Sequence, residues 1–175
     1  SPEDLVYDLS SYAAWGDTPM GRTILGTYES LDGITPDIMR NYMNNHYTSA
    51  NTIISVSGNF DDTFFELLEK YFGTKKMLDT KPYLPDAPYI SKNNIVKEKD
   101  IEQVQLVATF KGIDVMDESV YSLLVFNNVF GSGMSSRLFQ NIREQRGLVY
   151  SISAGHSAYI NTGVFDISAG MSPES

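Results

Sequence analysis

The chain has 175 residues, 42% of them hydrophobic, which is enough to build one well-packed domain or two small ones. Its formal net charge of -9 argues against a nucleic-acid partner, because phosphate backbones are bound by clustered Lys and Arg side chains. Cysteine is absent, so disulfides and thiolate zinc sites are excluded. No apolar run approaches the length of a membrane-spanning helix, so we expect a soluble, cytoplasmic protein with no membrane partner.

Two helix starts stand in the first part of the chain. Ser1-Pro2-Glu3-Asp4 combines an N-cap serine, a proline at the first helical position and acids in the first turn. Thr35-Pro36-Asp37 repeats this signal and predicts a helix that ends near His46. The chain closes on Ser172-Pro173-Glu174-Ser175, a further helix start, so both ends look cut from a longer protein.

A strand and a third helix are predicted next. Thr52 to Val56 is a short β-branched run, which predicts a buried strand followed by a turn. Asp61 or Asp62 can cap the following helix, which Gly73 ends. The apolar positions of this helix and of the helix before it are expected to face a core.

Residues 74–93 contain three prolines and no sustained period, which is typical of a linker. Beyond it, residues 94–99 and 103–110 predict strands, the second with alternating apolar residues. Residues 118–130 predict a strongly apolar helix and residues 136–146 a shorter amphipathic one.

Residues 149–160 and 164–169 predict a hairpin across Asn161-Thr162-Gly163, where the glycine can take a positive φ. Because strands and helices are grouped and do not alternate one by one, the sequence favours the α+β class, with antiparallel sheets and helices packed on them, over a doubly wound fold.

The stretch from Phe130 to Gly133, F-G-S-G, raises the question of a phosphate site. A Walker loop requires a preceding strand and a following Lys, and a dinucleotide fingerprint requires a third glycine. Neither context is present. The alternative is structural: the glycines end one helix and let the chain reverse into the next, which a serine caps.

Arg143 lies in the last turn of the predicted helix, Gly147 suits its C-cap, and Tyr150 opens the next strand. A glycine-capped reversal brings the helix end and the strand start within about 10 Å, so both side chains can reach one cavity. An Arg and a Tyr together can donate hydrogen bonds to a peptide carbonyl or a developing oxyanion. The alternative for Arg143 is a surface ion pair or a favourable charge at a helix C-terminus.

The two histidines do not form a recognisable metal or catalytic motif. His46 and His156 stand outside H-E-x-x-H and H-x-x-E-H patterns, and both are interpreted as structural. No G-x-S-x-G occurs. The paired acids Asp61-Asp62 and Asp117-Glu118 are better explained as helix caps than as acid/base pairs. We expect no metal ligand in this chain.

Two sets of residues, in the right order, resemble one known family. Leu25-Gly26-Thr27, Y-M-N-N-H-Y-T-S-A-N at residues 42–51 and I-S-V-S-G-N at 54–59 resemble the later part of the first domain of the pitrilysin/insulinase zinc metallopeptidases. S-S-R-L-F and I-R-E-x-x-G-L-V-Y, within residues 135–150, resemble the early part of that family's second, homologous domain. The mitochondrial-processing-peptidase-like branch is the most similar.

The resemblance implies an organisation and a chemistry. Residues 1–73 would be the end of the first peptidase-like domain, 74–93 the linker and 94–175 the start of the second. The family hydrolyses peptides in a chamber with zinc, and a homodimer or heterodimer of the longer protein is expected. Arg143 and Tyr150 match the substrate-contacting Arg and Tyr of its second domain in spacing and context.

Two departures from the family pattern are important. Gly131, Ser132 and Gly133 match the position of the substrate-handling glycine-rich loop of the processing-peptidase alpha subunit, but the loop is much shorter here. H-x-x-E-H and the third-ligand Glu are missing, because the family places both upstream of this stretch. We therefore expect zinc in the longer protein and an inactive fragment here. A non-catalytic partner or scaffold subunit, and a free-standing peptide-binding module, are the alternatives.

Overall fold

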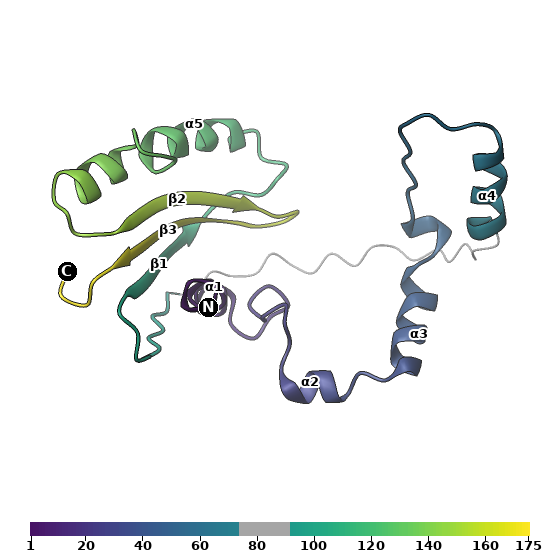
Figure 1. Cartoon of the computed structure of the whole chain (residues 1–175), viewed down its shortest axis with the longest axis horizontal. Coiled ribbons are helices and arrows are strands. Elements are labelled where there is room, and N and C mark those ends of the chain that lie inside the picture. The colour runs from purple at the N-terminus through teal and green to yellow at the C-terminus, as the bar shows by residue number, and fades with distance from the viewer. Residues whose placement is uncertain (74–91) are drawn as a thin grey trace. The chain divides into compact units, whose positions relative to one another are not determined.

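The computed structural model describes residues 1–73 and 92–175, which form two compact units (Figure 1). Within these ranges, one unit combines residues 1–24 with 92–175 and the other consists of residues 25–73. Residues 74–91 of the predicted linker lie outside the described residues. The division into two homologous domains at this linker rests on the family resemblance and stays a prediction.

The first unit is built on a three-stranded antiparallel sheet with the strand order β1-β3-β2. The strands are β1 (Val104–Lys111), β2 (Ser151–Ala158) and β3 (Gly163–Met171). The predicted hairpin is confirmed, since β2 and β3 pair along their length. The predicted strand at residues 94–99 is wrong, because these residues form no ladder with any strand in the described part of the chain.

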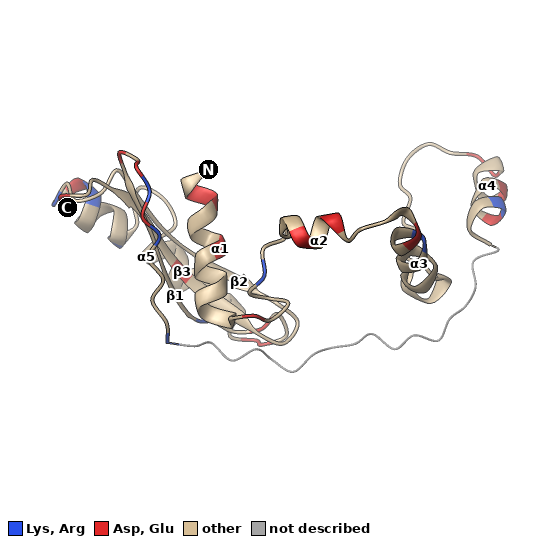
Figure 2. Cartoon of the chain, turned by 90° about the horizontal axis from the view of Figure 1, so that it is seen from below, with Lys and Arg blue, Asp and Glu red and all other residues tan. Residues whose placement is uncertain are grey.

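One face of the sheet is covered by α5 (Val120–Phe130), as Figure 1 shows. The ring of Phe165 in β3 lies 5.8 Å from the ring of Phe126 and 6.2 Å from that of Phe130, measured between centroids. No charged residue occurs in α5, so its ribbon is uniformly tan in Figure 2. The apolar helix predicted from the sequence is thus confirmed, and its Phe126 and Phe130 rings pack on the buried Phe165 ring, although no residue of α5 is itself fully buried.

The opposite face carries α1 (Pro2–Trp15). Trp15 is 5% exposed and packs with Val164 of β3, which is 4% exposed. The Trp15 ring also meets that of Tyr159 edge to face, with 5.8 Å between centroids. Because successive strand residues point to opposite faces of the sheet, the Val164 side chain points to the α1 face and that of its neighbour Phe165 to the α5 face.

A polar chain joins α1 to the sheet. Thr109 of β1 donates a hydrogen bond to Oδ1 of Asp166 in β3 at 2.6 Å, and its hydroxyl also shares a hydrogen bond with Ser10 of α1. Since Thr109 has one hydroxyl proton, Ser10 is the donor in the second bond. Burial raises the pKa of the Asp166 carboxyl, and the hydrogen bond from Thr109 offsets part of that rise. Three elements, α1, β1 and β3, are therefore tied together through the Thr109 hydroxyl.

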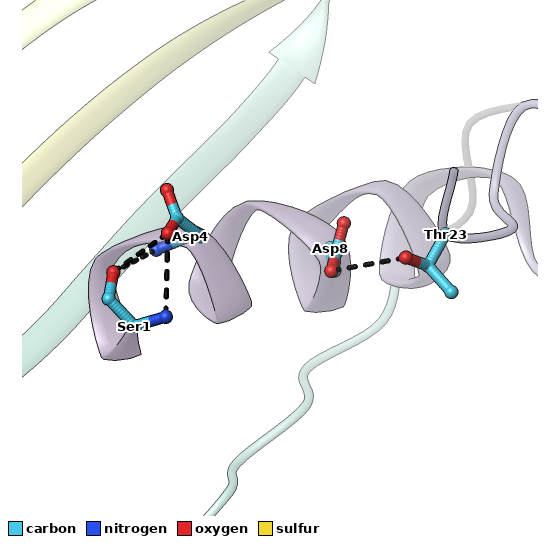
Figure 3. A network of polar contacts seen from close by, with 4 residues as sticks. All are labelled: Ser1, Asp4, Asp8 and Thr23. Carbon is cyan, nitrogen blue, oxygen red and sulfur yellow. Dashed lines mark hydrogen bonds and ion pairs between the residues drawn. The ribbon is translucent and has the colours of Figure 1, made fainter. Parts of the chain in front are cut away.

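The start and the middle of α1 are held by polar contacts (Figure 3). Ser1 caps the helix by accepting a bond from the Asp4 amide, and the Asp4 side chain reaches back to Ser1, as the sequence predicts. The chain beyond the helix folds back along it, and the Thr23 hydroxyl donates to Asp8 at 3.4 Å. The segment after α1 thus stays with the sheet-containing unit.

Gly163 corrects one expectation about the hairpin. Its φ is not positive. A Cβ at this position would lie 1.9 Å from the carbonyl oxygen of Ile113, and the Gly163 carbonyl accepts a bond from the Gly112 amide at 2.8 Å. Glycine is required here because another segment of backbone approaches closely, and the backbone angle plays no part.

The second unit contains α2 (Tyr28–Asp32), α3 (Pro36–His46), the short 3-10 turn Ser49–Asn51 and α4 (Thr63–Phe72). The predicted starts and ends of α3 and α4 are confirmed. Thr35 accepts a bond from the Ile38 amide at 3.3 Å, and Asp61 accepts one from the Thr63 amide at 3.0 Å. No described helix in the chain is long and apolar enough to cross a membrane.

Burial in this unit differs from the expectation. None of the residues in α2, α3 or α4 is buried, so the apolar faces predicted to point at a core are exposed or, at Phe64 and Leu68, only half-buried. The predicted buried strand at residues 52–56 is wrong for this chain: it is extended but unpaired, and Ile53 is 95% exposed. A strand needs a neighbour for its backbone groups, and the described residues of this unit contain no other strand.

Candidate functional site

The glycine-containing turn begins where α5 meets β2. A Cβ on Gly131 would lie 2.3 Å from the Cβ of Ala154 and 2.6 Å from its amide nitrogen. The Ala154 amide donates to the Gly131 carbonyl at 3.0 Å. Packing alone therefore requires glycine at position 131, because only a residue without a side chain lets the helix end approach the strand so closely.

The rest of the turn leads into the next helical segment. Gly133 has φ 101°, with nothing within 4 Å of its Cβ position, so it is selected for backbone conformation. Ser136 is 2% exposed and its hydroxyl accepts from the Phe139 amide at 3.3 Å, which confirms the predicted serine cap. The Gln140 side chain donates to the Met134 carbonyl at 2.8 Å and holds the turn against the helix. A substrate-contacting role for Gly131, Ser132 and Gly133 stays a prediction.

The helical segment after Ser136 is wider than the α-helix expected at residues 136–146. From Phe139 to Glu144 it is π-helical, with a bond from the Gln145 amide to the Gln140 carbonyl at 3.0 Å. Gly147 then takes φ 62° and its amide donates to the Arg143 carbonyl at 3.0 Å. The glycine-capped reversal expected before β2 is present.

This reversal brings Arg143 and Tyr150 together. Nε of Arg143 donates to the backbone carbonyl of Tyr150 at 2.8 Å, while the Tyr150 amide donates to the Gly170 carbonyl of β3 at 2.8 Å. The backbone of Tyr150 is thereby fixed on both sides, and the residue is 58% exposed. The predicted proximity of the two residues is confirmed, whereas their contact with a substrate stays a prediction.

Two further side chains that the sequence interpretation missed contact the Arg143 guanidinium. Its central carbon lies 4.7 Å from the centroid of the Phe139 ring, within the range of a cation–π interaction. Its Nη1 atom lies 3.1 Å from Oε1 of Glu144. The four-residue spacing from Phe139 to Arg143, which places two residues on one helix face, was the available signal for the first contact.

The histidines lie in the two different units. The ring of His46, in the last turn of α3, lies 4.3 Å from that of Tyr42. His156 of β2 pairs with Phe165, and its Nε2 atom is buried without a hydrogen-bond partner. Across the described ranges, no three His, Asp or Glu side chains are grouped so that they could hold a metal ion. These residues therefore do not fit a zinc site.

Comparison with known sequences gives a consistent result. Residues 33–175 match the family described as the peptidase M16 inactive domain. The chain is 41% identical to the uncharacterized zinc protease YmxG of Bacillus subtilis and 36% identical to an uncharacterized zinc protease of Rickettsia felis. Each match covers 97% of this chain and 41% of the relative, so the chain spans about two-fifths of the length of these relatives.

Solved structures share the fold. A protease from Helicobacter pylori aligns with a TM-score of 0.80 at 21% identity, and a peptidase M16 inactive domain from Pseudomonas fluorescens with 0.75 at 22%. A chain of complex III2 from Candida albicans aligns with 0.80 at 17%. Each alignment covers 99% of this chain and 43% of the other. At such identities the likeness shows the fold alone, and it confirms the predicted α+β class.

Proposed function

This chain belongs to the peptidase M16 family, in the part described as its inactive domain, and we propose that the longer protein containing it is a zinc-dependent endopeptidase that acts on peptides. The proposal is supported by two relatives, 41% and 36% identical to this chain, that are named as uncharacterized zinc proteases. Within that protein, this part supplies side chains that contact the peptide, whereas the metal is held elsewhere. Assignment to the processing-peptidase-like branch belongs to the same proposal, as does a homodimer or heterodimer of the longer protein.

The observation that carries the proposed role of this part is the hydrogen bond from Arg143 Nε to the Tyr150 carbonyl. It fixes the helix end to the strand start and leaves the Tyr150 hydroxyl free of any partner in the described part of the chain. An Arg and a Tyr held side by side can donate to a peptide carbonyl and to the negative charge that develops on it during hydrolysis. We assign this task to Arg143 and Tyr150.

Zinc in such a peptidase polarises the scissile carbonyl and activates a water molecule. The described residues of this chain do not fit a metal site, so the part that they play is limited to contact with the peptide. The turn at Gly131, Ser132 and Gly133 is proposed to border the space in which the peptide lies. The packing of Gly131 against Ala154 gives this border a fixed position relative to the strand that follows Tyr150.

A non-catalytic partner subunit is the second candidate. It is favoured by the family description itself, which calls the matching domain inactive. The two candidates differ in the part of the longer protein that lies outside this chain. An intact H-x-x-E-H there, followed by a further Glu ligand, supports the peptidase. Loss of that motif supports the partner subunit.

The test uses the longer protein with Arg143→Ala and Tyr150→Phe. We expect each change to lower kcat/KM for peptide hydrolysis, by up to about 10²-fold if the lost donor acts as an oxyanion-hole donor does. Tyr150→Phe keeps the backbone carbonyl that Arg143 binds, so it isolates the hydroxyl group. Arg146→Ala is the matched control, because Arg146 has no ion pair within the described residues.

Zinc content and the circular dichroism spectrum should be unchanged in all three variants. Unchanged kinetics in both Arg143→Ala and Tyr150→Phe would contradict the assigned roles. An equal loss of activity in Arg146→Ala would show that general positive charge, and no particular geometry, is responsible.

A further inference from the structure

We propose that Phe139 and Glu144 are positioning residues, which hold the Arg143 guanidinium in one orientation and present its Nη2 edge to a peptide carbonyl. This inference rests on the proposed function, because it concerns how Arg143 is prepared for a substrate. It assigns a task to two residues that do not themselves touch the peptide.

The guanidinium of Arg143 is contacted from three directions. The guanidinium carbon lies over the Phe139 ring, 4.7 Å from its centroid. In the plane of the group, Nε donates to the Tyr150 carbonyl at 2.8 Å and Nη1 donates to Glu144 at 3.1 Å. A guanidinium held by two hydrogen bonds and an aromatic ring has little rotational freedom.

The remaining atom is Nη2. Among residues 1–73 and 92–175, no acceptor forms a hydrogen bond with it. The Arg143 side chain as a whole is 41% exposed. A guanidinium has five N–H donors in a rigid fork, and the two on Nη2 are therefore available to a carbonyl oxygen.

The contact between Arg143 and Glu144 is not an ordinary helix-surface ion pair. Adjacent residues on a helix do not normally face each other, so this pair differs from the i, i+3 and i, i+4 pairs of helix surfaces. That segment is the π-helical stretch Phe139–Glu144, directly before the reversal at Gly147. Single π-helical turns are frequent at functional sites, and this one places the ring, the guanidinium and the carboxylate together.

A donor that is already oriented acts at the moment of reaction without first being ordered. A misplacement of about 1 Å in such a group can reduce turnover about 10²-fold. Loss of the Phe139 ring leaves both in-plane hydrogen bonds of Arg143 intact, so we expect a smaller effect, a decrease in kcat of roughly tenfold.

The experiment is a double-mutant cycle in the longer protein, with Phe139→Leu, Arg143→Ala and the double variant, assayed for peptide hydrolysis. We expect Phe139→Leu to lower kcat more than it raises KM in the wild-type background and to have no further effect once Arg143 is Ala. Phe139→Tyr should restore most of the activity, because it keeps an aromatic face. Tyr121→Leu, which removes a 74% exposed ring from α5, is the control.

The outcomes separate this inference from the proposed function. If Arg143→Ala impairs hydrolysis but Phe139→Leu does not, the positioning role is overturned and the proposed function stands. If Phe139→Leu and Arg143→Ala add independently, Phe139 acts through something other than Arg143 and the inference is also overturned. If Arg143→Ala has no effect, the role that the proposed function assigns to Arg143 fails, and this inference fails with it.

A second variant keeps the test decisive should Phe139→Leu fail to fold. Glu144→Gln retains the size of the side chain and removes its charge, and it leaves the Phe139 ring in place. We expect Glu144→Gln to lower kcat in the wild-type background and to leave kcat unchanged in the Arg143→Ala background. Independent effects in this second cycle would overturn the role of Glu144.

Discussion

The unit containing the sheet and the unit formed by residues 25–73 have helix signals of equal clarity and very different packing. Both contain side-chain caps, at Ser1 in the first and Thr35 in the second. In the first, Trp15, Val164 and Phe165 are buried between a sheet and two helices. In the second, the three helices bury no residue. Local signals are thus sufficient to define helices, but a core forms only where a paired sheet provides a surface to cover.

The largest expected effect on the free energy of unfolding comes from a substitution at Gly131, which tests this difference in packing. Gly131→Ala forces a Cβ to 2.6 Å from the Ala154 amide, and we expect it to lower the free energy of unfolding by about 3 kcal/mol. In the second unit, the nearest atom to a Cβ on Gly33 is 3.5 Å away, so Gly33→Ala should change the free energy of unfolding by less than about 0.5 kcal/mol. Urea unfolding measures the first change by the fluorescence of Trp15, the single tryptophan, which lies in the sheet-containing unit, and the second by circular dichroism of the helices. Equal effects would contradict the difference in packing.

A smaller effect is expected for apolar truncations. Val164→Ala leaves a cavity against Trp15 and should lower the free energy of unfolding by about 2 kcal/mol, whereas Ile53→Ala, at a 95% exposed position, should leave it unchanged in this chain. The same two variants can be compared in the longer protein. There we expect Ile53→Ala to be costly as well, because residues 52–56 gain a partner strand. Thermal unfolding of both proteins, each with both variants, gives the measurement.

The smallest expected effect is on the pH dependence of stability, and it comes from two carboxyl groups whose pKa values are shifted in opposite directions. Burial raises the pKa of Asp166 in the folded sheet, so this group favours folding at pH values below its unfolded pKa of about 3.9, and that contribution is lost as the pH rises through the raised folded value. Asp61 has a pKa lowered by hydrogen bonds from Thr63, so its contribution is present above the unfolded pKa and is lost as the pH falls.

The check is a series of urea titrations across pH with Asp166→Asn and Asp61→Asn. Asp166→Asn keeps an acceptor for the Thr109 hydroxyl and should remove the decline in stability with rising pH. Asp61→Asn should remove only a local, acid-side loss of α4 helicity, measured by circular dichroism. If both variants shift the pH dependence in the same direction, the opposite environments described for the two groups are wrong.

Much of the local structure was predictable because it depends on neighbouring residues. The caps at Ser1 and Thr35, the end of α4 at Gly73 and the hairpin that pairs Ala158 with Gly163 follow from short-range chemistry. The proximity of Arg143 and Tyr150 belongs here too, because a glycine with φ 62° at residue 147 reverses the chain between them. The resemblance to the zinc metallopeptidases likewise rested on short motifs, and the family match confirms it.

Other features depended on residues distant in the chain, and the sequence alone did not reveal them. The docking of α1 on the sheet through Ser10, Thr109 and Asp166 joins positions separated by 57 and 99 residues. Gly163 is required by an approaching carbonyl of Ile113, and the β-branched run at 52–56 stays unpaired because strand formation needs a second strand. Sequence by itself determined the start of α1, the bounds of α3 and α4 and the family, because each depends on residues close together in the chain. Only the tertiary structure decided which apolar faces are buried and how Arg143 is held, because both depend on what packs beside them.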